Sequence, residues 1–240
     1  MHAIWVIAKR ELATFFDSLI AYILLVLFLG ISGLFTWMLG SDIFFIGQAS
    51  LKPFFGVSYW TLFLLIPMLT MRLLAEEKKT GTIELLLTKA VTDRQVVIGK
   101  FLSTILLVLI ALAATIPYVV TVSNIGKADL GQIFCGYLGL LLMSAMYGSV
   151  GLYASSVTTN QIVAILATLF IGLLFHFIFG FLGYYSTGWL GQVFVALSLE
   201  SHFDSMTRGV LDTRDLIYFL SITVIGIFLA ELSLTKRQAA

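Results

Sequence analysis

Long stretches without any charged residue constrain this chain more than any other feature of its sequence. Between Asp17 and Asp42 lie 24 uncharged residues, and between Asp129 and Glu200 lie 70. One helix needs about 20 apolar residues to cross a hydrocarbon core that is ~30 Å thick. The stretches are near-continuous rather than alternating in polarity, which favours helices over barrel strands, because backbone groups in lipid must pair within the protein. The sequence therefore predicts an all-α polytopic membrane protein.

The charge content supports the same conclusion. Charged residues make up 11% of the 240 residues and hydrophobic residues 60%, whereas a soluble domain has about 25% charged residues. Lipid must therefore be the main solvent of this chain. The formal net charge of +1 argues against nucleic acid as a partner. The only cysteine, Cys135, excludes an intramolecular disulfide.

Six spanning helices in a single transmembrane domain, residues 1–240, account for the uncharged stretches. The longest stretch suits two helices joined by the polar turn at 155–160. The spans are expected at residues 18–40, 54–72, 96–122, 131–154, 160–183 and 215–235.

The basic residues predict the orientation of these spans, because cytoplasmic segments carry an excess of Lys and Arg. Ten basic residues fall on one set of segments, namely Lys9, Arg10, Arg72, Lys78, Lys79, Lys89, Arg94, Lys100, Lys236 and Arg237. Four fall on the other set, namely Lys52, Lys127, Arg208 and Arg214. Both termini and the loop between spans two and three are therefore expected in the cytoplasm, which agrees with an even number of spans.

The first 17 residues are expected to form an amphipathic helix in the cytoplasmic headgroup layer. Trp5 lies on its apolar face, and Lys9 and Arg10 lie opposite, a pattern typical of interfacial helices. Glu11 and Asp17 argue against a cleavable signal.

Residues 73–95 form the most polar segment and are expected to be a folded cytoplasmic loop. Gly81 is a candidate N-cap for a short helix that ends at Thr88, with Glu84 in its first turn. Thr92 with Gln95 is a capping box that begins the third span.

Residues 184–214 mix aromatic residues with glycine and polar residues, and predict short amphipathic helices at the extracytoplasmic surface. Ser201 with Asp204 is a further capping-box candidate, and Gly209 is a helix stop. The alternative is a seventh span at 184–199, which would place the basic C-terminal residues outside, against the charge distribution.

The sequence contains no P-loop, so we expect no ATP site in this chain. Gly99-Lys100 and Gly126-Lys127 are not followed by Ser or Thr, which that motif requires. We likewise expect no catalytic, cofactor-binding or metal-binding residues. If ATP powers this protein, a separate subunit must hold the ATP and its Mg²⁺.

Two alternatives from other classes stay open. Ser32, within Gly30-Ile31-Ser32-Gly33, and His176 could form an intramembrane serine hydrolase, although small-residue patterns are common packing motifs in membrane helices. The preferred interpretation of His176 is a neutral residue that hydrogen-bonds between helices. A non-transporting membrane scaffold is the other alternative. No Asp or Glu lies in the middle of a span, which weakens a proton- or sodium-coupled carrier.

Small residues form a stripe on the fourth span that is expected to pack against other helices. Its members are Gly136, Gly139, Ser144, Gly148 and Gly151.

The loop between spans two and three resembles the corresponding loop of ABC-2-type transporter permeases. Its segment 72–86 has an acidic pair, a basic residue and a Gly-Thr-x-Glu-x-Leu motif, and Gly99-Lys100 opens the third span. Lys9-Arg10-Glu11-Leu12 is also similar to that family, whereas Lys89-Ala90-Val91 replaces a proline of many relatives. Within the family, the segment 206–212 resembles the permease of the gliding-motility-associated transporter.

The resemblance implies the six-span ABC-2 permease fold, with an N-terminal interfacial helix and a cytoplasmic coupling helix at Gly81–Thr88. It implies a subunit of an ATP-driven exporter in the cell (inner) membrane, without enzymatic activity of its own. The implied partners are two ABC ATP-binding subunits, which carry ATP and Mg²⁺, and a second permease copy or a related membrane protein. The residues implied in ATPase coupling are Glu76, Glu77, Gly81, Thr82, Ile83, Glu84, Leu85, Leu86 and Leu87. Lipid-linked, peptide or polymer cargo and mechanical signalling are all compatible with the sequence.

Overall fold

The computed structural model describes residues 2–39, 49–82 and 91–238. Six of its helical segments are long and apolar enough to cross a membrane, which confirms the predicted number of spans. These segments are Leu19–Trp37, Lys52–Thr80, Asp93–Ile125, Leu130–Val157, Gln161–Tyr185 and Thr213–Lys236. No strand occurs in the described residues, so the predicted all-α fold class is confirmed.

Several spans consist of more than one helical element. The elements that belong to the spans are α2 (Leu19–Trp37), α4 (Lys52–Thr70), α5 (Ala75–Thr80), α7 (Asp93–Ala113), α8 (Ile116–Ile125), α9 (Leu130–Val157), α10 (Gln161–Leu173), the π-helix η1 (Leu174–Ile178), α11 (Phe179–Tyr185) and α14 (Thr213–Gln238). Three further helices lie outside them, namely α1 (His2–Asp17), α12 (Gly188–Leu197) and α13 (Leu199–Thr207).

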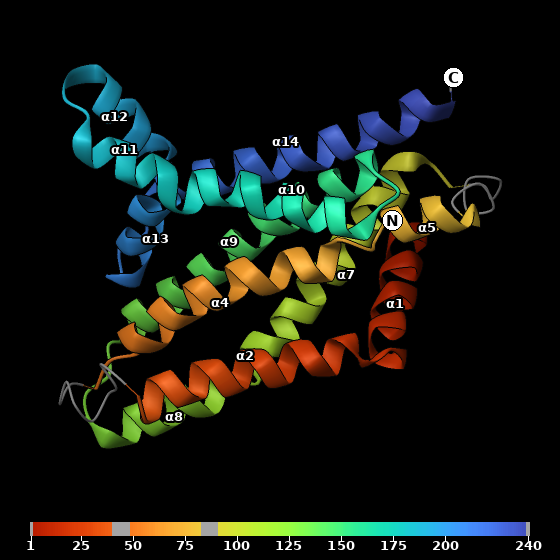
Figure 1. Cartoon of the computed structure of the whole chain (residues 1–240). Coiled ribbons are helices and arrows are strands. Elements are labelled where there is room, and N and C mark those ends of the chain that lie inside the picture. Colours follow the sequence, from red (N-terminus) through yellow and green to blue (C-terminus); the bar gives the residue numbers. More distant parts are fainter. Residues whose placement is uncertain (1, 40–48, 83–90, 239–240) are drawn as a thin grey trace.

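Helices α4 and α9 form the centre of the bundle (Figure 1). Two thirds of the residues in the apolar part of their spans are buried (67%), compared with 22–28% for the spans that contain α2, α10 and α14. Helix α14 packs along α9, where Gly226 brings the two backbones together at Ser149. Small residues permit this approach, since lipid offers no hydrophobic driving force between helices.

The two ends of the bundle differ. Both termini, α1 and α5 lie at one end, which we call the terminal end, and α12 and α13 lie at the other, the distal end (Figure 1). Helix α1 runs steeply to α2 and packs against α7. Its Trp5 is 54% exposed, whereas Ala8 and Phe15 are buried. The position of α1 in the headgroup layer stays a prediction.

The third span breaks between α7 and α8, which the sequence analysis did not anticipate. Pro117 lies in the first turn of α8, where its missing N–H costs no hydrogen bond within that helix but ends the preceding one. The Thr115 hydroxyl lies 2.8 Å from the hydroxyl of Tyr137 on α9. The break is therefore supported by a contact with the central helix.

Two of the predicted helix-end signals are confirmed and one is wrong. The Thr92–Gln95 capping box is confirmed, with both reciprocal hydrogen bonds present at the start of α7. Gly209 is confirmed as a helix stop, because it follows α13 with a φ of 85°. The Ser201–Asp204 capping box is wrong: α13 begins at Leu199, and the Ser201 hydroxyl donates to the carbonyl of Ser198 instead. Helix α12 has only 10 residues, too few for a seventh span.

Candidate functional site

A serine on the central helix fastens the polar segment that follows α4. The backbone N–H groups of Leu74 and Ala75, where α5 begins, donate to Ser155 Oγ at 3.0 and 2.9 Å. Ser155 in turn donates to the carbonyl of Met71 at 3.0 Å. The first N–H groups of a helix have no partner within the helix and need an external acceptor. Ser155 thus serves as a cap supplied by another span, and it joins the end of α4 and the start of α5 to α9.

A buried ion cluster joins α5 to α1 and α7. Lys100 Nζ lies 2.8 Å from Glu77 Oε1 and 3.1 Å from Glu11 Oε1. The Lys100 side chain is only 1% exposed, and the two glutamates are 16–19% exposed. A charge so deeply buried is tolerated only when it is paired. Three elements must therefore keep their relative positions for Lys100 to remain paired.

Close packing of α1 on α7 brings Glu11 within reach of Lys100. The neighbouring Gly99 leaves no room for a side chain, because an added Cβ would lie 2.7 Å from the Ile7 side chain and 3.2 Å from the carbonyl of Ile4. The Gly99-Lys100 pair therefore has two physical roles, since the glycine admits α1 and the lysine binds it.

Further polar contacts surround this cluster at the terminal end. Arg72 donates to Ser18 Oγ at 3.1 Å and lies over the ring of Phe15, a favourable cation–π arrangement. Lys78 donates to the carbonyl of Ser156, and Ser233 of α14 donates to the same carbonyl at 2.9 Å. A cavity of ≈ 310 Å³ with a mixed charged lining lies between α1 and α5. We call Glu11, Glu77, Lys100 and Ser155 the loop anchor.

The structure describes part of the coupling segment that was predicted from the sequence. Glu77 is in the loop anchor, whereas Glu76 is exposed and lines the cavity beside it. Gly81 has a φ of 72° and ends α5. Its role as the N-cap of the next helix stays a prediction. The Thr82 hydroxyl lies 2.9 Å from that of Thr80. The remaining predicted coupling residues, Ile83, Glu84, Leu85, Leu86 and Leu87, lie outside the described residues, as does the predicted coupling helix through Thr88.

Lys100, Glu11 and Ser155 were not among the residues predicted from the sequence to be functional. Glu77 is 23 residues from Lys100 in sequence, and Glu11 is on the first helix. No local pattern links them. Lys100 itself was a signal, because a lysine within an apolar spanning segment is rarely buried without a partner.

The stripe on α9 meets several helices. No side chain fits at Gly136, which lies against the Phe55 ring of α4, or at Gly151, which lies against Thr70. Gly139 faces Phe203 of α13. The two other members face α7 or their own helix: Gly148 faces Thr104, and Ser144 donates to the carbonyl of Leu140.

His176 lies in the π-helix η1 and is 1% exposed. Its Nδ1 lies 2.8 Å from the Tyr147 hydroxyl on α9, and its carbonyl accepts a hydrogen bond from the Tyr59 hydroxyl at 3.0 Å. It is therefore hydrogen-bonded between helices. Ser32 instead donates to the carbonyl of Leu29 on its own helix. The contacts of Ser32 and His176 thus provide no nucleophile–base pair for the hydrolase alternative.

The described residues include no group of three or more His, Cys, Asp or Glu placed to hold a metal ion. At the terminal end, directional polar contacts connect the short polar helix α5 to α1, α7 and α9. Residues 5–234 match the family model described as ABC-2 family transporter protein. No curated protein sequence matches the chain.

Proposed function

The chain belongs to the ABC-2 transporter family and is a membrane permease of an ABC transporter, and on that premise we propose that it couples ATP hydrolysis by partner subunits to export. The family places the ATPase on separate ABC ATP-binding subunits. In this proposal such a subunit contacts the segment from Arg72 to Lys100, and its movement is transmitted to the membrane helices through that segment.

The loop anchor is the observation that carries this proposal. Lys100 pairs with Glu77 and Glu11, and Ser155 accepts from the start of α5. Hydrogen bonds and ion pairs depend on direction as well as distance. A displacement of α5 must therefore carry α1, α7 and α9 with it or break these contacts. This is the connection that a rigid-body change of the membrane helices requires.

The complete assembly in this proposal contains two permease copies, or this chain and a related one, and two ABC ATP-binding subunits that hold ATP and Mg²⁺. The set of segments with ten basic residues includes both terminal segments and α5, and these lie together at the terminal end (Figure 1). This supports cytoplasmic termini, because cytoplasmic segments carry the excess of Lys and Arg. The membrane in question is the cell (inner) membrane. ATP binding would shift the population between two arrangements of the paired permeases.

The gliding-motility-associated branch of the family is the finer assignment within this proposal. It is supported by the similarity of segment 206–212, which includes the end of α13 and the turn at Gly209. A gliding defect in cells that lack the chain would support this branch, and normal gliding would contradict it without affecting the permease assignment.

Two variants separate docking from coupling. The chain is co-expressed with its ABC ATP-binding subunit, purified in mild detergent and reconstituted in liposomes. Lys79→Glu changes an exposed residue of α5 and is expected to reduce co-purification of the ATPase. Lys100→Met changes the loop anchor and is expected to retain the ATPase but to abolish the change in ATP hydrolysis rate caused by the permease.

The matched control is Lys127→Glu, which reverses an exposed charge at the other end of the bundle. It should leave both readouts unchanged. The proposal fails if Lys79→Glu and Lys127→Glu behave alike, or if the ATPase of the Lys100→Met complex responds to the permease as in the unmodified complex.

A further inference from the structure

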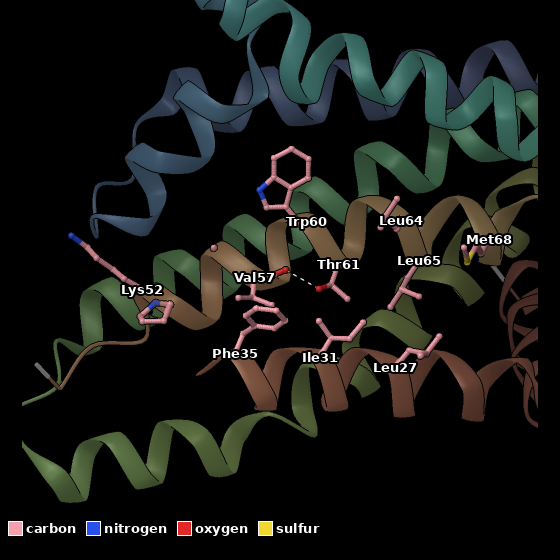
Figure 2. A pocket seen from close by; sticks show the side chains of 12 residues that line it. Leu27, Ile31, Phe35, Lys52, Val57, Trp60, Thr61, Leu64, Leu65 and Met68 are labelled. Atoms are coloured by element: carbon pink, nitrogen blue, oxygen red, sulfur yellow. Dashed lines mark hydrogen bonds between the residues drawn. The ribbon is translucent and has the colours of Figure 1, made fainter. Parts of the chain in front are cut away.

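Two cavities meet on the surface of α4 near the distal end. The larger, ≈ 870 Å³, is an apolar groove between α2 and α4 that extends from Lys52 to Met68. The smaller, ≈ 410 Å³, lies between α4, η1 and α13. Lys52, Gly56 and Trp60 line both cavities. In Figure 2, Ile31 and Leu27 of α2 point toward α4, whereas Trp60 is turned away from α2.

Gly56 lines both cavities, and its lack of a side chain leaves open space where they meet. A Cβ built on Gly56 would meet no atom within 4 Å. The absence of a side chain there is thus not required by packing against a neighbouring helix, in contrast to Gly136. The two cavities can consequently accept one elongated molecule.

The smaller cavity contains a buried hydrogen-bonding atom without a partner. His176 lines this cavity, and its Nε2 is buried and has no hydrogen-bond partner among the described residues. The buried Tyr147 hydroxyl has only His176 Nδ1 as a hydrogen-bond partner in the described part of the chain. Tyr147 must donate to Nδ1 to satisfy its own hydrogen, so the neutral ring carries its proton on Nε2. An unpaired buried donor is costly, and an acceptor oxygen in the cavity would satisfy it.

The π-helix holds this donor in place. His176 is stacked between Tyr59 and Phe63, with ring centroids 3.9 and 4.4 Å away. Its carbonyl accepts a hydrogen bond from the Tyr59 hydroxyl. Single π-turns within α-helices occur often at functional sites. The orientation of His176 is thus fixed by two spans other than its own.

Opposite charges line the smaller cavity. Lys52 and Glu200 both line it and are exposed, and neither forms an ion pair within residues 2–39, 49–82 and 91–238. Arg208 and Asp204 also line it but pair with each other at 3.0 Å. One free cation and one free anion complement a zwitterion better than an anion or a cation.

We propose that the joined cavities bind one zwitterionic diacyl phospholipid with a primary amine, from the leaflet at the distal end. Its phosphate lies beside Lys52 and its ammonium beside Glu200. An ester carbonyl oxygen accepts the hydrogen bond from His176 Nε2, and an acyl chain occupies the groove between α2 and α4. The apolar lining of that groove, with Ile31, Leu64 and Met68 among its members, suits a hydrocarbon chain.

The test uses the full chain purified in mild detergent, with native mass spectrometry to count bound lipid. The probes are phosphatidylethanolamine and, as the anionic comparison, phosphatidylglycerol. One phosphatidylethanolamine should be retained per chain, with phosphatidylglycerol bound about tenfold more weakly, because it lacks the amine that makes a charge-assisted hydrogen bond with Glu200.

Gly56→Leu fills the space where the two cavities meet and should weaken retention of phosphatidylethanolamine about tenfold or more, because steric exclusion acts on the lipid and not on the fold. Gly30→Leu is the matched control, since Gly30 is also exposed on a spanning helix and a Cβ there meets nothing within 4 Å. Glu200→Gln removes the carboxylate that binds the amine and should abolish the preference between the two lipids, while thermal unfolding of the protein stays unchanged.

Three outcomes would overturn the proposal. One is equal retention by Gly56→Leu and the unmodified chain. Another is an equal loss in Gly30→Leu, which would mean that the lipid is part of the general annulus. The last is efficient crosslinking of Gly56→Cys to a second copy, because the groove would then be an interface between two chains.

Discussion

Replacing Lys100 by methionine tests whether the loop anchor holds the terminal end together. Lys100 Nζ lies 3.1 Å from Glu11 Oε1 and 2.8 Å from Glu77 Oε1, so these two oxygens are at most about 6 Å apart. Two unit charges at that separation repel by about 3 kcal/mol at an effective dielectric constant of ~20. Removing one partner of a buried ion pair costs ~3–5 kcal/mol.

Partial exposure of the glutamates selects the lower end of that range. Because Glu11 is 16% exposed and Glu77 is 19% exposed, water reaches both carboxylates, so we expect Lys100→Met to lower the free energy of unfolding by about 3 kcal/mol. The triple variant Glu11→Gln/Glu77→Gln/Lys100→Met removes all three charges. It should unfold within about 1 kcal/mol of the unmodified protein, since replacing a whole buried ion cluster by uncharged groups is often neutral.

The measurement is reversible unfolding by SDS in mixed detergent micelles, followed by circular dichroism. Lys127→Met, which removes an exposed lysine at the distal end, is the control and should leave the transition unchanged. A loss below about 1 kcal/mol in Lys100→Met would refute the reasoning, because it would show that the buried charges do not depend on one another. So would a triple variant no more stable than the single one.

Other substitutions test the contacts that surround this cluster, with the same unfolding assay. Ser155→Ala leaves two backbone N–H groups without an acceptor and should lower the free energy of unfolding by about 2–4 kcal/mol. Ser123→Ala, at an exposed serine, should have no measurable effect, and equal effects of the two variants would contradict the capping role. Gly136→Leu should cost at least ~1–3 kcal/mol by overpacking against α4, whereas Gly30→Leu should fold normally, and an equally stable Gly136→Leu would mean that the helices separate easily. Thr92→Ala should cost about 1 kcal/mol through the lost cap, and Thr92→Asn should restore most of it if capping is the reason.

The number and type of spans could be predicted because charge is excluded from the hydrocarbon core wherever a helix crosses it. Asp17, Lys52, Lys100 and Asp129 each lie near the end of an apolar stretch, so they mark the spans without any knowledge of tertiary contacts. The match of residues 5–234 to the ABC-2 family confirms the family assignment made from the loop motif.

Breaks within spans were harder to predict than their number. Pro117 was a visible signal for the end of α7, yet its effect depends on the contact between Thr115 and Tyr137. The π-helix at Leu174–Ile178 has no proline or glycine to mark it. Its His176 is hydrogen-bonded by Tyr59 and Tyr147, which come from other helices, so the contacts around it cannot be found from the local sequence.

The loop anchor could not be predicted either, because its contacts also join residues from different helices. The family motif predicted a coupling role for Glu77, but its partners Lys100 and Glu11 come from two other elements. Pairing between residues that are far apart in sequence has no local period or spacing. A single sequence can show that a lysine is present in an apolar segment, and only the fold shows which carboxylates reach it.

The terminal end and the glycine stripe of α9 are held by different kinds of contact, and this difference favours coupling at the terminal end. Along the glycine stripe of α9 the contacts are apolar, such as Gly136 against Phe55 and Gly139 against Phe203. Apolar contacts have no preferred direction, so helices can shift slightly against one another at little cost. At the terminal end Lys100 and Ser155 make directional contacts that fail if α5 shifts by more than a fraction of a hydrogen-bond length. In the proposed mechanism a push on α5 therefore moves the terminal end as one body, and the apolar contacts of the glycine stripe accommodate the movement.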